Sequence, residues 1–332
     1  MNYISQEMTI EKEIIIENYL HHVGIDKVRQ EIYNGLQMEP KRISPKYFYD
    51  EYGSELFEKI THLEEYYPTR TEYSILSTIY KELNINLSNT SIVELGSGDA
   101  SKITLFLNQI PQEVLATIDY YPVDISGSAI KKATDLLRKK FPVLRIRGYV
   151  LDIFHQLEII PFDKPRIFCF FGSTIGNMTP KEIKTFLQML NKTMKKGDRL
   201  LLGMDMIKDI HILEAAYNDA DGITAEFNKN ILNVINRLAN TNFNKEDFSH
   251  YTFYNRQMNR IEMHLKAMED MEIYSPFFNP IILKKGEMIH TENSHKFSRT
   301  SIDEMTEWAE LSLVKVLTDQ NDYFSIALME KQ

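Results

Sequence analysis

The sequence predicts an α/β fold in which a doubly wound, mainly parallel sheet carries a second, smaller α+β unit. Short apolar runs alternate with segments of helical periodicity between residues 91 and 204, which is typical of successive strand–helix–strand units. A glycine-rich loop follows the first apolar run. The alternation ends after Asp205. In such a sheet, ligands bind at the carboxyl ends of the strands, near the point where the strand order reverses.

Each element of the sheet follows from its own apolar pattern. Strands are expected at residues 91–95, 115–124, 145–151, 166–171 and 199–204. Helices are expected at residues 101–109, 127–140 and 180–196, where apolar side chains recur at helical spacing. The terminal run at residues 323–328 is expected to rejoin the sheet as an edge strand.

The N-terminal part has two kinds of pattern. Residues 10–37 and 71–84 have helical spacing. Residues 40–70 are instead dense in aromatic side chains and contain prolines, which break or bound helices. A surface loop rarely contains this many Tyr and Phe, so these rings are expected to line a site.

The remaining segments suggest how the chain divides into domains. Residues 209–241 are predicted to be mainly helical, and residues 250–315 are predicted to form antiparallel strands with a helix near 301–311. No Pro/Gly-rich linker separates two consecutive, independent domains. We therefore expect two interleaved domains: residues 70–205 with 320–332, and residues 1–69 with 206–319.

Composition argues against several classes of protein. The 332 residues include 38 Lys and Arg against 47 Asp and Glu, a net charge of −9, whereas binding to nucleic acids or anionic membranes depends on clustered cations. No apolar stretch approaches the roughly 18 residues of a membrane span. The N-terminal segment has early acids and lacks the pattern of a signal peptide. We expect a cytoplasmic protein without nucleic-acid or membrane partners.

Thiol and metal chemistry are not expected either. The single cysteine, Cys169, excludes a disulfide or a cysteine-rich zinc site within the chain. Its apolar neighbours favour a buried, inert thiol over a nucleophile. The nine histidines show no H-x-x-x-H pair, and residues 218–222 lack the spacing of an EF-hand calcium loop.

The loop ELGSG at residues 94–98 indicates a nucleotide-like cofactor, because its glycines let the backbone approach a bound molecule. The third glycine of the dinucleotide fingerprint is replaced by Ser101. This shortened form resembles motif I of the S-adenosylmethionine-dependent methyltransferases. Asp124, at the next strand end, suits the ribose hydroxyls, while Asp152 and Ile153 suit the adenine amino group and ring.

The segment FFGSTIGN at residues 170–177 ends the fourth predicted strand. Its two glycines and its amide lie where a methyl donor and its acceptor would meet. Asn177 can donate and accept hydrogen bonds, which suits an amino-acid head group. It is equally compatible with a turn residue or an N-cap of the following helix.

The chain as a whole resembles the bacterial histidine Nα-methyltransferases of ergothioneine biosynthesis, from about residue 38 to the C-terminus and in the same order. The resemblance is carried by the segments PKYFYDEYGSELFEKITHLEEYYPTRTEYSIL, IVELGSGDASKI, FFGSTIGNMTP, LLLGMDMIKD, AAYNDADGITAEFNKNILNVINR, RIEMHL and TENSHKF. It implies a Rossmann-like class I methyltransferase sheet with an α+β substrate-binding domain. It also implies three methyl transfers from S-adenosylmethionine to the α-amine of L-histidine, giving hercynine and S-adenosylhomocysteine.

The resemblance also implies roles for individual residues. Those matched to the head group of the amino-acid substrate are Tyr66, Asn177 and Tyr217, and those matched to its imidazole are Glu292 and Ser294. Thr224 and Met263 match further positions of the pocket wall, and Tyr49 and Phe57 match aromatic residues that close over the site. Those matched to the cofactor are Gly96, Gly98, Lys102, Asp124, Asp152 and Ile153. Asn177 and Tyr49 are expected to orient the amine while water removes its proton. Glu292 and Ser294 are expected to read the two distinct nitrogens of the imidazole ring.

Two other hypotheses remain open from the sequence. An enzyme of the same fold could methylate another amino acid or a histidine derivative, although the chain keeps Glu292, which relatives acting on tryptophan derivatives would be expected to lose. A protein of the same fold could also bind S-adenosylmethionine without turnover. We expect a monomer that acts on small molecules.

Overall fold

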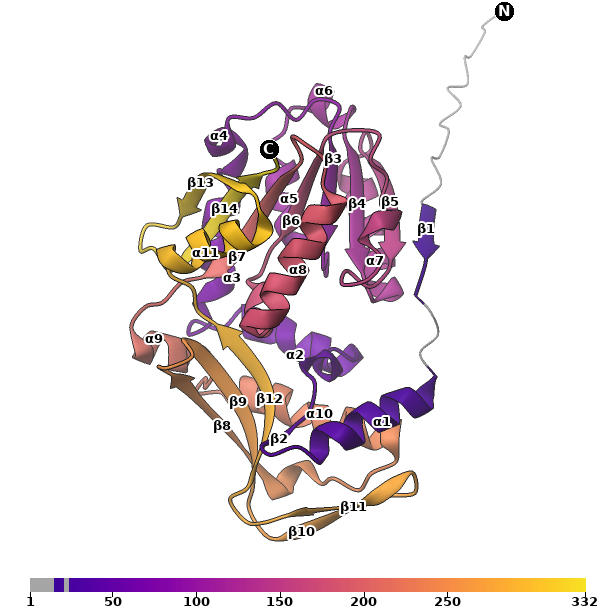
Figure 1. Cartoon of the computed structure of the whole chain (residues 1–332), viewed down its shortest axis with the longest axis vertical. Helices are drawn as coiled ribbons and strands as arrows, with labels where there is room; N and C mark the ends of the chain where they lie inside the picture. The colour runs from indigo at the N-terminus through magenta and orange to yellow at the C-terminus, as the bar shows by residue number, and fades with distance from the viewer. Residues whose placement is uncertain (1–14, 21–23) are drawn as a thin grey trace, which may run out of the picture.

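The computed structural model describes residues 15–20 and 24–332. Figure 1 shows two units, one above the other: a large sheet flanked by helices, and a smaller sheet with helices of its own. The long strand β12 (Met288–His295) rises from the smaller unit toward the larger one. The chain passes between the units several times, because each is built from separate segments.

The larger unit is built on an eight-stranded sheet. Its strands lie in the order β1 (Ile15–Asn18), β5 (Arg145–Val150), β4 (Asp119–Asp124), β3 (Ser91–Leu95), β6 (Arg166–Phe170), β7 (Arg199–Asp205), β14 (Phe324–Glu330) and β13 (Ser312–Thr318). Neighbours from β1 to β7 are parallel, whereas β14 is antiparallel to β7 and β13. The order runs outward from β3 in both directions, so the predicted doubly wound α/β sheet is confirmed.

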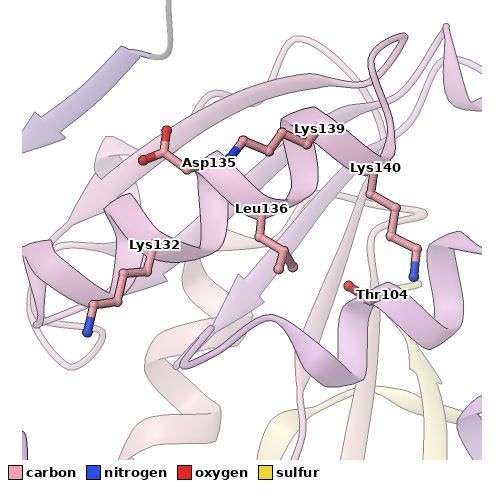
Figure 2. A pocket seen from close by; sticks show the side chains of 6 residues that line it. All are labelled: Thr104, Lys132, Asp135, Leu136, Lys139 and Lys140. Atoms are coloured by element: carbon pink, nitrogen blue, oxygen red, sulfur yellow. The ribbon is translucent and has the colours of Figure 1, made fainter.

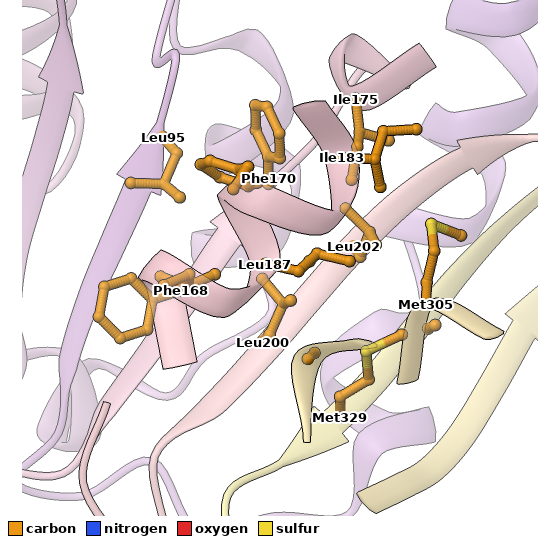
Figure 3. Packing of buried hydrophobic residues seen from close by; sticks show 14 of the residues in the cluster. Leu95, Phe168, Phe170, Ile175, Ile183, Leu187, Leu200, Leu202, Met305 and Met329 are labelled. Carbon is orange, nitrogen blue, oxygen red and sulfur yellow. The ribbon is translucent and has the colours of Figure 1, made fainter. Parts of the chain in front are cut away.

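Helices cover both faces of this sheet. One face carries α8 (Pro180–Thr193) and α11 (Arg299–Ala309), and the other carries α3 (Tyr67–Leu76), α4 (Ile79–Leu83), α5 (Ser101–Leu107), α6 (Gln112–Leu115) and α7 (Gly127–Lys140). On the first face, Phe170 and Leu202 of the sheet pack with Leu187 of α8 and Met305 of α11 (Figure 3). Because both faces of the sheet are buried, the sequences of its parallel strands are almost continuously apolar.

Three predictions about the strands of the large sheet were wrong in detail. Residues 15–18 form β1, not part of a helix over 10–37: the helix α1 (Ile25–Leu36) begins later, and residues 10–14 lie outside the described residues. The β-branched side chains of Ile15 and Ile16 favour extended backbone. The terminal strand β14 does rejoin the sheet, but between β7 and β13, so it is not an edge strand. The start of the predicted strand at 115–124 is the end of α6.

The smaller unit contains a four-stranded sheet and a separate hairpin. The sheet has the order β2 (Lys41–Arg42), β12, β9 (Arg260–Ala267) and β8 (Phe248–Asn255), and the hairpin pairs β10 (Met271–Ser275) with β11 (Phe278–Leu283). Strands β8, β9 and β12 are antiparallel, as predicted. The helices of this unit are α1, α2 (Glu51–Thr61), α9 (Ile210–Ala215) and α10 (Ile223–Ala239), with the 3-10 turns η1 (Pro45–Phe48) and η4 (Lys245–Asp247).

Two segments lie in a different unit from the one that the predicted domain division assigned. Strand β13 and helix α11 fall within residues 206–319, yet β13 belongs to the large sheet and α11 packs against α8. Strand β1 falls within residues 1–69 and also joins the large sheet. The aromatic segment 40–70 forms η1, α2 and the start of α3, with Pro45 and Pro68 in the first turns of η1 and α3.

The described part of the chain offers no membrane-spanning helix, since none of its helices is both long and apolar enough. Within the same residues, no three His, Cys, Asp or Glu side chains gather where they could hold a metal ion. Cys169 is fully buried in β6, as predicted. Burial raises the pKa of its thiol well above the ordinary value, which leaves it unreactive.

A buried ion pair ties together the amino ends of β6 and β7. Arg166 is 2% exposed; its Nε donates to Asp198 Oδ2 at 2.9 Å, and its backbone N–H donates to Asp198 Oδ1 at 2.8 Å. Asp198 also accepts from the backbone N–H of Lys195 at 2.8 Å. Removing one partner of such a pair leaves an uncompensated buried charge.

We therefore expect Asp198→Ala to lower the free energy of unfolding by about 3–5 kcal/mol, measured by urea denaturation. The double variant Arg166→Met, Asp198→Leu should recover part of this loss, because no charge is then left unpaired, although the backbone N–H groups of Arg166 and Lys195 still lack their acceptor. A loss below about 1 kcal/mol for Asp198→Ala would contradict the assigned role of the pair.

Candidate active site

The carboxyl ends of the parallel strands face the smaller unit. Asp124 and Asp205 are the last residues of β4 and β7, and Gly96 and Gly172 follow β3 and β6 closely. The 3-10 turn η3 (Thr174–Asn177), which follows β6, packs against β12 of the smaller sheet. Side chains from both units therefore meet at this edge.

The loop after β3 forms an open cradle. Gly96 and Gly98 have φ values of +70° and +50°, a backbone conformation that residues other than glycine rarely adopt. The backbone N–H of Gly98 donates to Asp124 Oδ2 at 3.2 Å, which holds the loop against the end of β4. A Cβ atom at either glycine would meet nothing within 4 Å, so the backbone borders open space. These features fit a ligand that lies directly on the loop.

Two carboxylates lie at the neighbouring strand ends. Asp124 Oδ1 accepts from the backbone N–H of Ser126 at 2.9 Å. Asp152, after β5, accepts from the backbone N–H of Phe154 at 2.8 Å and lies 2.9 Å from Nδ1 of His155. Both carboxylates keep lone pairs for a further hydrogen bond. Ile153 packs against the core beneath α8.

Lys102 and Glu72 form an ion pair under the same edge. Glu72, on α3, is 1% exposed; its Oε2 lies 3.3 Å from Lys102 Nζ, and its Oε1 accepts from the backbone N–H of Gly172 at 2.7 Å. Burial opposes the charge on Lys102, but Glu72 outweighs it and raises the lysine pKa above the ordinary value. A Cβ at Gly172 would lie 2.5 Å from Lys102 Nζ, and one at Gly203 would lie 2.7 Å from Glu72 Oε1. Glycine at these positions makes room for the pair.

On the opposite side, Asn177 and Glu292 join the two units. Asn177 Nδ2, in η3, donates to Glu292 Oε1, in β12, at 3.3 Å. Thr179, and not Asn177, caps helix α8, with Glu182 completing a capping box, so the N-cap interpretation of Asn177 was wrong. Glu292 is 7% exposed, and this burial raises its pKa to about 7 although the nearby Lys296 lowers it.

Ser294, two residues further along β12, lies beside Tyr217. The two hydroxyl oxygens are 2.7 Å apart. Lys296 Nζ donates to Ser294 Oγ at 2.8 Å, to Tyr217 Oη at 3.1 Å and to Asp205 Oδ2 at 2.7 Å. Sequence reasoning singled out Ser294 and Tyr217 but missed Lys296 and Asp205. A carboxylate that ends a strand, like Asp124, was the available signal for Asp205.

Aromatic rings form a wall next to these polar groups. Ring centroids are 5.8 Å apart for Tyr49 and Phe57, 6.2 Å for Phe57 and Tyr66, and 6.1 Å for Tyr66 and Tyr217, with edge-to-face geometry in each pair. Tyr49 is 49% exposed and lies at the outer end of the series. The rings of Tyr49, Phe57 and Tyr66 thus lie next to one another and to Tyr217, while their role in lining a substrate site stays a prediction.

Two further predicted residues lie in the wall of the smaller unit. Met263, in β9, is 1% exposed and pairs directly across from Glu292 of β12. Thr224, in the first turn of α10, is 3% exposed, and its hydroxyl has no hydrogen-bond partner among the described residues. Asp219 accepts from the backbone N–H groups of Ile223 and Thr224 at 2.8 Å each, so the turn at residues 218–222 leads into α10 and Asp219 binds the first turn of that helix.

The surface hollow between α5 and α7 lies apart from all of these residues. Figure 2 shows its lining, which consists of Thr104, Lys132, Asp135, Leu136, Lys139 and Lys140. None of the predicted site residues lines it. The basic run 138–140 lies in the last turn of α7, where cations favourably meet the helix dipole.

Comparison with known proteins agrees with this geometry. A family described as histidine-specific, S-adenosylmethionine-dependent methyltransferases matches residues 28–331. The chain is 35% identical over 316 residues to the histidine N-alpha-methyltransferase of Mycobacterium tuberculosis, covering 94% of this chain and 98% of that protein. It is 37% identical over 300 residues to the protein of that name from Mycolicibacterium smegmatis, covering 90% and 92%.

A more distant relative is ergothioneine biosynthesis protein 1 of Neurospora crassa. The identity is 28% over 298 residues, which is 86% of this chain and 32% of that longer protein. The similarity to the two mycobacterial proteins, in contrast, extends over nearly the whole of both chains. The chain therefore belongs to the family of histidine-specific, S-adenosylmethionine-dependent methyltransferases.

Proposed function

We propose that this protein transfers three methyl groups from S-adenosylmethionine to the α-amine of L-histidine, giving hercynine, a step of ergothioneine biosynthesis. The observation that carries the proposal is the pairing of Glu292 and Ser294 on one face of β12, next to Asn177 and below the cofactor-loop edge of the large sheet. A carboxylate and a hydroxyl can satisfy the two ring nitrogens of an imidazole. The names of the relatives support the same substrate and pathway.

The cofactor supplies a methyl group on a sulfonium centre, and the chain supplies its binding site. Gly96 and Gly98 let the backbone approach it, and Asp124 accepts hydrogen bonds from its ribose hydroxyls. Asp152 accepts a hydrogen bond from the adenine amino group, and Ile153 contacts the adenine ring. The Lys102 ammonium, held by Glu72, offers a cation to the carboxylate of the cofactor's amino-acid end.

The acceptor amine needs a free lone pair and correct alignment. Asn177 and Tyr49 orient it, and solvent water takes its proton. Holding the amine in line with the reacting carbon makes the displacement effectively intramolecular, which is the main catalytic contribution of such a site. Each transfer removes an N–H donor, and the third makes a permanent cation. The rings of Tyr49, Phe57 and Tyr66 hold methylated ammonium groups by cation–π contacts of about 0.5–2 kcal/mol.

The two units have separate roles in this proposal. We propose that the large sheet binds the cofactor and that the smaller unit, with β12 and the aromatic segment, binds the substrate. A monomer that acts on small molecules in the cytoplasm is the proposed working form.

The proposed activity is tested with purified protein, L-histidine and S-adenosylmethionine. Mass spectrometry should detect mono-, di- and trimethylated histidine, with hercynine as the end product. A panel containing tryptophan, other amino acids and histidine derivatives tests the alternative acceptors. Cofactor binding without any methylated product would instead indicate a non-catalytic binding protein.

Glu292→Gln should weaken histidine binding about 10–100-fold at pH 8 and leave cofactor binding unchanged, because a neutral amide accepts the ring N–H less strongly than a carboxylate. Because the pKa of Glu292 is raised to about 7, its carboxylate takes up a proton as the pH falls below 7. The protonated group is a weaker hydrogen-bond acceptor, so histidine should bind less tightly at lower pH. Histidine affinity should therefore fall more steeply between pH 7 and 5.5 in wild type than in the variant, measured by calorimetry with S-adenosylhomocysteine present.

Equal weakening of both ligands by Glu292→Gln would refute the assignment of Glu292 to the substrate. Parallel pH profiles for wild type and variant would refute its titration in this range. The ring of free histidine titrates near pH 6.5 in both proteins, so only the difference between the two profiles is informative.

Gly172→Ala should raise the dissociation constant of S-adenosylmethionine at least about tenfold, because the added Cβ would lie 2.5 Å from Lys102 Nζ and displace it. The matched control is Gly197→Ala. Gly197 also has a positive φ, +86° against +77° at Gly172, but its Cβ would meet nothing within 4 Å.

Both alanine variants should lose about 1–2 kcal/mol of stability from backbone strain. Only Gly172→Ala should lose cofactor affinity. Equal cofactor affinities in the two variants would contradict the role of Lys102.

A further inference from the structure

Lys296, directly after β12, has an ammonium group that is completely enclosed by protein. Its side chain is 0% exposed, and its three N–H bonds go to Asp205 Oδ2 at 2.7 Å, Ser294 Oγ at 2.8 Å and Tyr217 Oη at 3.1 Å. An ammonium has three donors and no acceptor, so its hydrogen-bonding capacity is fully used. Two of its three partners are hydroxyls matched to the substrate.

The hydrogen atoms of these two hydroxyls can be counted. Ser294 Oγ and Tyr217 Oη each accept one hydrogen bond from Lys296, and at 2.7 Å one of them donates to the other. The hydroxyl that receives both bonds has filled its two lone pairs. It can offer a ligand only its own hydrogen, whereas the other hydroxyl has used its hydrogen inside the pair and keeps one lone pair.

We propose that Lys296 is a positioning and specificity residue: it fills one lone pair of Ser294 while Tyr217 donates to the other, so that Ser294 can only donate to the substrate's imidazole ring and thereby selects its neutral form. The inference rests on the proposed function. Glu292 lies two residues before Ser294, on the same face of β12. The pocket then offers one acceptor and one donor, which matches a neutral ring with one N–H and one bare nitrogen.

An imidazolium ring fits this arrangement poorly. It carries two N–H groups and no lone pair, so one N–H would point at a hydroxyl that donates. The ring would also place a second cation close to Lys296. Burial opposes the charge on Lys296, but Asp205 more than offsets it and keeps the pKa of the lysine above its ordinary value. Lys296 therefore stays charged throughout the pH range in which histidine titrates.

The charged and titratable groups around Lys296 come from several elements. They are Asp205, Lys208, Tyr217, Tyr254, Glu292 and His295. Lys296 lowers the pKa of Glu292 against the effect of burial. Replacing Lys296 by a neutral residue should therefore let Glu292 hold its proton to higher pH.

A purely structural role for Lys296 is the competing explanation, because its ion pair with Asp205 joins the two units. Lys208 provides the matched control. Its ammonium also binds Asp205, is 4% exposed, and donates to Tyr67 Oη at 2.8 Å, but it has no hydrogen bond to Ser294 or Tyr217. Lys208→Met and Lys296→Met thus each leave Asp205 with one cation.

The experiment measures histidine binding by calorimetry between pH 5.5 and 8.5 with S-adenosylhomocysteine present, for wild type and both variants. Lys296→Met should weaken histidine at least about tenfold at pH 8 and shift the acid limb of the binding profile to higher pH. Lys208→Met should leave that limb in place. The affinity for S-adenosylhomocysteine alone should stay within about twofold in both variants.

Equal changes in histidine affinity and pH profile for the two variants would overturn the inference and leave the proposed function intact. A wild-type protein that binds no histidine would overturn both. A measurement without any variant covers the case in which Lys296→Met fails to fold: nitrogen NMR of ring-labelled histidine bound to wild type at pH 6. A bound ring with one protonated nitrogen supports the inference, whereas a bound imidazolium overturns it.

Discussion

The Asp205 carboxylate and its two lysines hold the architecture of the site together. Asp205 ends β7 of the large sheet, and its carboxylate binds Lys296 from the end of β12 and Lys208 from the chain that leaves β7, both buried. The backbone reinforces the joint, because the N–H of Phe297 donates to the Asp205 carbonyl at 2.8 Å. A buried charge without its partner costs several kcal/mol, so the two units meet in one geometry. The hydroxyls of Ser294 and Tyr217 take their positions from that joint.

A second carboxylate–lysine ion pair lies at the other end of the candidate site. The buried Glu72 forms an ion pair with the partly exposed Lys102, in space that Gly172 and Gly203 leave open. In both pairs a buried carboxylate holds a lysine in place: Lys102 lies beside the cofactor loop, and Lys296 lies behind the hydroxyls of Ser294 and Tyr217. Preorganised charges of this kind need no rearrangement when a ligand binds, which is the condition for electrostatic stabilisation to be large.

Local patterns predicted most of the fold, and long-range contacts explain the rest. The helices α7 and α8 and strands β3 and β6 lie within a few residues of their predicted bounds, because their apolar spacing and caps are local. The placement of β14 inside the sheet depends on pairing with β7, more than 100 residues earlier. The predicted site residues came from motifs, whereas Lys296 was not singled out because its partners Asp205 and Tyr217 lie 91 and 79 residues away. A lysine beside apolar Phe297 gives no local sign that it is buried.

The arrangement of polar and aromatic groups also bears on how one pocket can hold an amine through three methylations. Each transfer replaces an N–H donor by a methyl group, so a pocket that bound the amine through several acceptors would lose them one by one. The groups nearest the proposed amine position are instead one amide, Asn177, and the ring series of Tyr49, Phe57 and Tyr66. Ring faces attract an ammonium whether it carries hydrogens or methyl groups. In the proposed function, Glu292 and Ser294 read the substrate at its other end, where no bond changes. Under that proposal, specificity stays constant while the amine is transformed.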